Sequence, residues 1–277
     1  MIVQHNMASA NTNRQLGITT GSLAKSTEKL SSGYRINRAG DDAAGLSISE
    51  KMRGQIRGLE QASTNAQDGI SLIQTAEGAL NETHSILQRM RELTVQAAND
   101  TNVTADRQAI AKEVRALTSE VTRIAKQTEF NTMKLLSGTL TGKKLQVGAN
   151  GLQNIKLSIK SMKAHDLGIT STIAKTISSS SSDSTAISNL ISVVNEAITR
   201  VSTQRSKLGA LQNRLEHTIA NADNTAENLQ SAESRIRDVD MAKEMVQYSK
   251  NNILQQAAQS MLAQANQSTQ GVLSLLQ

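Results

Sequence analysis

The residue types that most often carry catalysis or bind metals are few in this chain and widely separated. The four histidines, His5, His84, His165 and His217, form no H-E-x-x-H motif and no other ligand spacing. No cysteine is present, so the sequence offers neither disulfides nor thiolate ligands. Gly-rich phosphate-binding motifs and the G-x-S-x-G nucleophile motif are also missing. The sequence therefore predicts no enzyme, no metal site and no cofactor.

Two adjacent carboxylates, Asp41 and Asp42, are the arrangement closest to an acid–base pair. Side chains of neighbouring residues diverge around a helix, which argues against shared proton chemistry. Arg35, Arg38 and Arg53 lie nearby in the sequence, so ion pairing is the better interpretation.

The composition favours long, unbroken helices. The 277 residues include no proline, whereas ordinary usage is about 5%. Only three side chains are aromatic, so the core must consist of Leu, Ile, Val, Met and Ala. The net charge of +6 comes from scattered Lys and Arg residues, with almost no aromatic rings for base stacking. We therefore expect no nucleic-acid binding.

Apolar residues spaced three and four apart predict the elements that must position any site. Three such seams, free of charged residues, run from Leu59 to Ala97, from Ile110 to Thr128 and from Ile187 to Ile236. Their repeat is typical of left-handed helix bundles. We predict an all-α-dominated fold, a long antiparallel coiled-coil or helical-bundle rod with a paired N- and C-terminal helix unit and one small β-hairpin.

Each chain end carries half of a further seam, and the simplest closure pairs the two ends with each other. A two-helix unit this polar is marginal alone, so we expect it to become ordered on assembly. The predicted polymerisation residues are Leu16, Leu23, Leu30, Leu254, Ala258, Met261, Ala265, Val272 and Leu275.

Other segments interrupt or flank the helical pattern. Alternating apolar residues from Leu145 to Ile159, around Asn150-Gly151, predict the hairpin. The run Ser178 to Ser182 predicts a flexible connector. No basic and apolar signal-peptide pattern appears from Met1 to Asn13, and the uncharged tail from Asn251 is too rich in Gln and Asn to span a membrane.

Several motifs resemble those of the bacterial flagellin family. The resemblance covers about the first 140 and the last 85 residues. The motifs that carry it are Ser31 to Ile48, Gln61 to Ala66, Gln74 to Leu80, Arg214 to His217, Glu233 to Asp238 and Gln264 to Gln267.

The resemblance implies a structural subunit of the extracellular flagellar filament, a homopolymer that drives motility. It also implies unfolded export by the flagellar type III route, a chaperone on the C-terminal region, and contacts with filament cap and junction proteins. Residues 1–44 and 236–277 would form the inner helical unit, 45–177 the outer rod with its hairpin, and 178–235 the returning helix. The alternatives are a hook-filament junction protein and, in a different class, a coiled-coil nucleic-acid-binding protein.

Charged residues at both chain ends predict a collar that fixes subunit orientation, with solvated flanks as the alternative. Within this group we expect Arg38 to pair with Asp238. The charge collar consists of Arg35, Arg38, Asp41, Asp42, Arg235, Arg237, Asp238 and Asp240.

The first long helix carries a second candidate surface. The seam leaves Arg89 and Leu93 on another side of the helix, where an apolar anchor beside a forked donor is typical of an interface. A neighbouring subunit would be the first partner for this face. The resemblance implies a second, the host Toll-like receptor 5. The predicted contact residues are Gln88, Arg89, Glu92, Leu93, Gln96 and Glu113.

Overall fold

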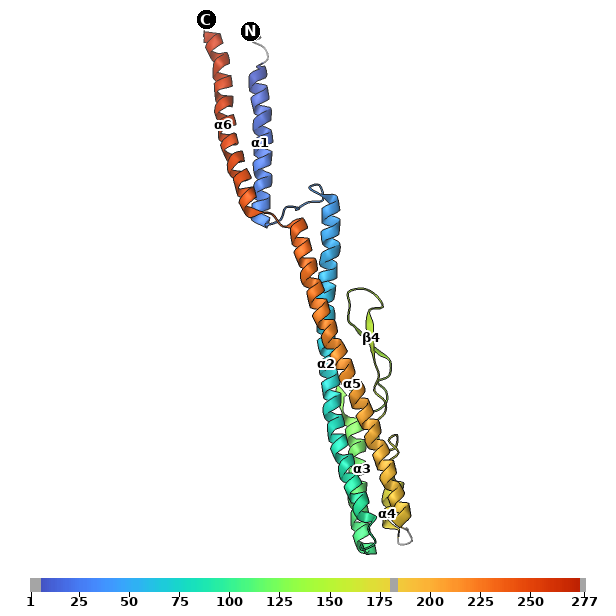
Figure 1. Cartoon of the computed structure of the whole chain (residues 1–277). Coiled ribbons are helices and arrows are strands. Elements are labelled where there is room, and N and C mark those ends of the chain that lie inside the picture. Colours follow the sequence, from blue (N-terminus) through green and yellow to red (C-terminus); the bar gives the residue numbers. More distant parts are fainter. Residues whose placement is uncertain (1–5, 180–183, 275–277) are drawn as a thin grey trace. The chain divides into compact units, whose positions relative to one another are not determined.

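The computed structural model describes residues 6–179 and 184–274 (Figure 1). Helices dominate, as the sequence predicts. The chain divides into a terminal unit, Met1–Ile56 with Glu227–Gln277, and a long-helix unit, Arg57–Ala226. The helices are α1 (Met7–Ser32), α2 (Ala43–Ala97), α3 (Thr104–Gln127), α4 (Ser171–Ser178), α5 (Ser184–Arg237) and α6 (Met241–Ser274).

The boundary between the two units falls inside α2 and inside α5. The domain limits expected from the sequence lie after residues 44, 177 and 235, where the apolar repeat is interrupted. The serine-rich connector lies mostly outside the described residues. No helix within residues 6–179 and 184–274 combines the length and hydropathy needed to cross a bilayer.

In the terminal unit, α1 lies beside α6 in an antiparallel arrangement (Figure 1). The Asn6 side chain accepts the N–H of Ser9 at 3.0 Å and so caps α1, while its amide donates to the Ala265 carbonyl at 3.0 Å. Further along, Ser26 and Asn251 are 4% and 5% exposed, and the Asn251 amide donates to the Ser26 hydroxyl. The most deeply buried contact described between these helices is therefore polar.

In the long-helix unit, one core cluster joins α2, α3, α4 and α5. Most predicted seam positions are buried there, including Ile73, Leu87, Val114 and Leu208. At Gly69 an added Cβ would lie 2.7 Å from the Cδ1 of Leu145, so the absence of a side chain permits close packing of the hairpin on α2.

The predicted hairpin is present and pairs β3 (Lys143–Gln146) with β4 (Asn154–Leu157). A second, unpredicted hairpin pairs β1 (Glu129–Phe130) with β2 (Met133–Lys134). Its two-residue turn holds Asn131 and Thr132 at φ 46° and 63°. Asparagine tolerates this backbone region, but threonine rarely adopts it. Because Thr132 stands where a turn of this kind usually has glycine, the sequence did not indicate the turn.

Candidate functional site

We call the predicted contact residues on α2, together with Glu113 on α3, the α2 contact face. Three of its predicted polar residues lie together in the structure. Arg89 donates from Nε and Nη2 to Oε1 of Glu113 on α3, at 3.1 and 3.0 Å. Its Nη1 also donates to Glu92, at 3.2 Å. Hydrogen bonds to Glu113 and Glu92 raise the pKa of Arg89. The guanidinium is half exposed, so α2 and α3 present one fixed, mixed-charge surface.

The prediction that Leu93 is an exposed anchor is wrong. Its side chain is 2% exposed and belongs to the core cluster together with Met90, and the neighbouring Thr94 is also buried. The cluster draws side chains from α3, α4 and α5 as well as α2, so α2 buries a wider face here than a strict seam would. Leu93 therefore supports the fold.

Val95 is the exposed apolar residue on this part of α2, and the sequence analysis missed it. Its side chain is 51% exposed. It lines a shallow surface hollow of about 500 Å³ with Gln88, Arg91, Glu92 and Gln96. Spacing could have identified it, because residues four and seven apart share a helix face, and Val95 follows Arg91 and Gln88 at these intervals.

We expect Leu93→Ala to lower the free energy of unfolding by about 2–5 kcal/mol, because it leaves a cavity in the core. Val95→Ala, at an exposed position, should change it by no more than about 0.5 kcal/mol. Urea unfolding followed by circular dichroism measures both changes. Equal stability of the two variants would contradict the burial of Leu93.

The predicted polymerisation residues fall into two groups. Leu16, Leu23, Leu30, Ala258 and Ala265 are partly buried in the terminal unit. In contrast, Leu254 and Met261 are 42% and 59% exposed, so they do not belong to the α1–α6 interface. Leu275 lies outside the described residues, as does the side chain of Val272.

The exposed group extends beyond the predicted residues. Six of these side chains lie on α6 and two on α1, and each is at least two-fifths exposed. They are Met7, Ile18, Met241, Met245, Val246, Ile253, Leu254 and Met261. We call these eight residues the apolar terminal surface.

Backbone contacts bring the two halves of the charge collar together. The N–H of Arg35 donates to the Arg237 carbonyl at 2.7 Å, and the N–H of Val239 donates to the Gly33 carbonyl at 3.0 Å. The Arg237 guanidinium lies 4.6 Å from the ring centre of Tyr34, a cation–π contact. The segments before α2 and after α5 are thus joined within the terminal unit.

The expected pair between Arg38 and Asp238 is not formed. Arg38 instead donates to Glu28 on α1 at 3.0 Å. Asp238 itself lies in an isolated β-bridge with Tyr34. Arg235 likewise points along its own helix and donates to Ser231.

The three other acidic residues of the collar bind backbone N–H groups. Asp41 accepts from Arg38 and Asn37, and these hydrogen bonds lower the pKa of its carboxyl. Asp42 accepts the N–H of Gly45 at 2.8 Å and stabilises the start of α2. Asp240 accepts the N–H of Lys243 at 3.1 Å and does the same for α6. These carboxylates shape the chain rather than neutralise the collar's arginines.

Family models for two regions match the chain. The bacterial flagellin N-terminal helical region matches residues 3–141, and the bacterial flagellin C-terminal helical region matches residues 191–276.

Several full-length relatives are more than half identical to this chain. A flagellin of Halalkalibacterium halodurans is 57% identical over 276 residues, and a flagellin of Bacillus subtilis is 55% identical over 303 residues. Both alignments cover 100% of each chain. The fold also resembles a putative flagellar hook-associated protein from Vibrio parahaemolyticus, with a TM-score of 0.61 and 12% identity. That match covers 72% of this chain and 100% of the other.

Proposed function

This chain belongs to the bacterial flagellin family, and from that premise we propose that its apolar terminal surface drives polymerisation. Its role is that of a structural subunit of the extracellular flagellar filament. The family is one of structural proteins, and we expect no catalytic activity.

The observation that carries the assembly proposal is the exposure of large apolar side chains on α1 and α6. Ile253, Leu254 and Met261 lie within a segment that has no charged residue, and all three face solvent in the isolated chain. Burial of such side chains between subunits provides a free energy of association of about 25 cal/mol per Å². The surface is therefore suited to contact its counterparts on neighbouring copies.

The interior of the terminal unit supports the same proposal. Its buried contact between Ser26 and Asn251 is polar, and the leucines of α1 are only partly covered. Helices with so little apolar burial are marginal in isolation. We infer that residues 1–44 and 236–277 become fully stable only as the inner helical unit of the filament, while 45–177 and 178–235 form the outer rod.

Neither alternative accounts for the chain as well. A hook-filament junction protein shares the fold, but the full-length relatives at 57% and 55% identity are flagellins. A nucleic-acid-binding coiled coil would leave the apolar terminal surface without a role. Negative-stain microscopy of the purified chain tests the assignment directly, because a flagellin is expected to form filaments and neither alternative is.

We also propose that the chain is exported unfolded and held before export by a chaperone on its C-terminal region. The exposed apolar residues of α6 give such a chaperone a surface, and the filament later covers it. Cap and junction proteins would contact the same terminal unit at the ends of the filament.

The α2 contact face is proposed as a contact for a neighbouring subunit and, in the free monomer, for Toll-like receptor 5. The ion-paired Arg89, Glu92 and Glu113 provide fixed polar groups, and Gln88, Val95 and Gln96 line the adjoining hollow. Glu92 links the two groups, because it pairs with Arg89 and also lines the hollow with Val95, and an apolar side chain close to an anchored charge pair is typical of an interface hot spot. Val95 replaces Leu93 as the apolar contact in this proposal.

We expect Arg89→Ala combined with Val95→Ala to weaken receptor binding by the monomer at least about tenfold, which is roughly 1.4 kcal/mol. A monomer pull-down titration measures the affinity. Arg214→Ala with Leu152→Ala is the matched control, because both residues are exposed in the same unit but lie away from this face. Unchanged receptor affinity in the first double variant would refute the assignment.

Assembly of the same variants separates the two proposed partners. If Arg89 and Val95 contact a neighbouring subunit, the first double variant forms fewer filaments in negative stain than the control. If they contact the receptor alone, assembly is unchanged while receptor affinity falls.

A further inference from the structure

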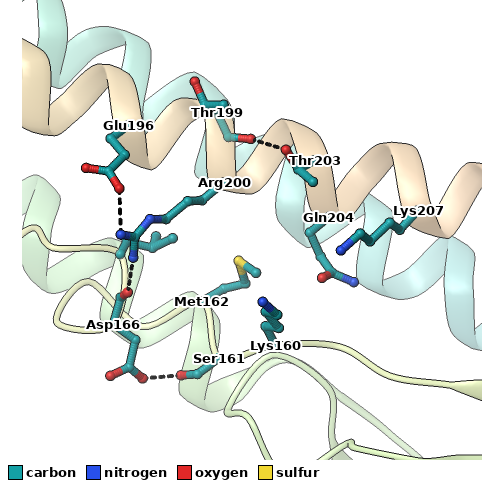
Figure 2. Close-up of a pocket in the computed structure, with 11 residues that line it drawn as sticks. Lys160, Ser161, Met162, Asp166, Glu196, Thr199, Arg200, Thr203, Gln204 and Lys207 are labelled. Carbon is teal, nitrogen blue, oxygen red and sulfur yellow. Dashed lines mark hydrogen bonds and ion pairs between the residues drawn. The ribbon is translucent and has the colours of Figure 1, made fainter.

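A hollow of about 540 Å³ in the long-helix unit lies outside every surface discussed above. The segment that follows β4 forms one wall and α5 forms the other (Figure 2). Its volume is within the range of small-molecule sites. The lining residues are Lys160, Ser161, Met162, Asp166, Leu167, Glu196, Thr199, Arg200, Thr203, Gln204 and Lys207.

Both carboxylates of the hollow are already engaged. Glu196 accepts from Arg200 at 2.7 Å, and the same guanidinium donates to the backbone carbonyl of Asp166 at 3.0 Å. The Asp166 carboxylate accepts the Ser161 hydroxyl and lies 3.2 Å from Nδ1 of His165. The hydrogen bond from Ser161, aided by His165, lowers the pKa of Asp166. Both carboxylates therefore already have hydrogen-bond partners other than the lysines of the hollow.

Two ammonium groups remain without an acidic partner among the described residues. Lys160 and Lys207 both line the hollow, and Figure 2 shows Lys207 extending toward Gln204 while the ammonium group of Lys160 lies on the Met162 side. Ion pairs within the described parts of the chain include neither lysine. Both lysines are exposed, so solvent screens their mutual repulsion, but an anion bound between them would attract both ammonium groups.

Gln204 supplies a second, independent observation. It occupies a seam position of α5 whose neighbours in the seam, Val201 and Leu208, are apolar and buried. Its own side chain is 4% exposed, and its amide donates to the Ser158 carbonyl at 3.4 Å, which is a long hydrogen bond. A buried polar residue with so weak a partner lowers stability, which suggests a role at the hollow it lines.

The rest of the hollow offers an apolar floor and hydroxyl groups. Met162 and Leu167 are buried beneath it. Thr199 and Thr203 donate their hydroxyl hydrogens to backbone carbonyls on α5, so their oxygens remain free to accept hydrogen bonds from a ligand.

We propose that this hollow binds a phosphate monoester of a small hydroxylated molecule, such as a sugar phosphate. A phosphate monoester carries nearly two negative charges at neutral pH, which matches the two unpaired ammonium groups. The threonine oxygens accept from the sugar hydroxyls, while Met162 and Leu167 contact its carbon skeleton. Filament building does not require this site.

Calorimetric titration of the full-length monomer with glucose 6-phosphate tests the proposal. Saturable binding is expected, and Lys160→Gln with Lys207→Gln should weaken it at least about tenfold. The matched control is Lys143→Gln with Lys144→Gln, which removes the same charge from exposed positions on β3. Absence of saturable binding, or an equal loss in both double variants, would overturn the proposal.

Further ligands and one further variant identify what the hollow recognises. Equal affinity for inorganic phosphate assigns binding to the phosphate group alone, whereas tighter binding of the sugar phosphate adds the apolar floor. Glucose, which is uncharged, should not bind, and binding equal to that of its phosphate would contradict the role of the lysines.

Gln204→Leu should weaken binding while raising the melting temperature, and unchanged affinity would remove Gln204 from the site. Negative stain of each variant should show normal filaments.

Discussion

Deletion of residues 251–277 is expected to abolish filament growth while the long-helix unit stays folded. The deletion removes most of α6, including Ile253, Leu254 and Met261 of the apolar terminal surface. It also removes Asn251 from its contact with Ser26, so α1 loses its partner and should unfold. The long-helix core is built from α2, α3, α4 and α5 and does not use the deleted segment.

Negative-stain microscopy and circular dichroism measure the two consequences of this deletion. No filaments should form, and the helical signal should fall by about the share of α1 and α6 while the main thermal transition persists. Filaments of normal length would refute the proposed role of the tail. Loss of the main transition would show that the long-helix unit depends on it.

Met261→Lys is expected to stop assembly without unfolding the monomer. Met261 is 59% exposed in the isolated chain, so lysine is well solvated there. In the proposed subunit contact the ammonium would be desolvated without a partner, at a cost of several kcal/mol. A penalty of about 3 kcal/mol already raises the protein concentration needed for growth by more than about a hundredfold.

Sedimentation of assembled filaments over a range of protein concentrations measures this effect. Met261→Leu is the matched control, because it keeps an apolar side chain of similar size and should assemble normally. If Met261→Lys assembles at the concentration that wild type requires, Met261 lies outside the subunit contact. A lower melting temperature of the variant monomer would contradict the exposure of Met261.

The long helices and most of their buried residues could be predicted because apolar periodicity reports burial directly. The exposure of individual residues beside a seam could not be predicted in the same way. Leu93 is buried because several helices pack around that stretch of α2, and the width of a buried face depends on how many neighbours a helix has. Val95 is different, because its spacing from Arg91 and Gln88 could have placed it on the exposed face.

The terminal unit illustrates a second limit. Its pairing was predicted, but the spacing placed Leu254 and Met261 in the same seam as Ala258 and Ala265. One apolar pattern can serve a contact within the chain and a contact between chains, and the pattern alone does not separate them. For the charge collar, the sequence indicated that its residues near α1 and near α5 lie close together. It did not indicate that Asp41, Asp42 and Asp240 accept hydrogen bonds from backbone N–H groups instead of pairing with arginines.

The pairing of α1 with α6 also has a kinetic consequence. The contact between Asn6 and Ala265 joins residues 259 positions apart, close to the largest separation that the chain permits. Contacts of such separation form late, because loop closure must precede them. Under the proposed unfolded export, the partner helix of whichever chain end leaves first arrives last. We expect this delay to give each new subunit an interval in which its long-helix unit folds while its two end helices remain free to bind the growing polymer.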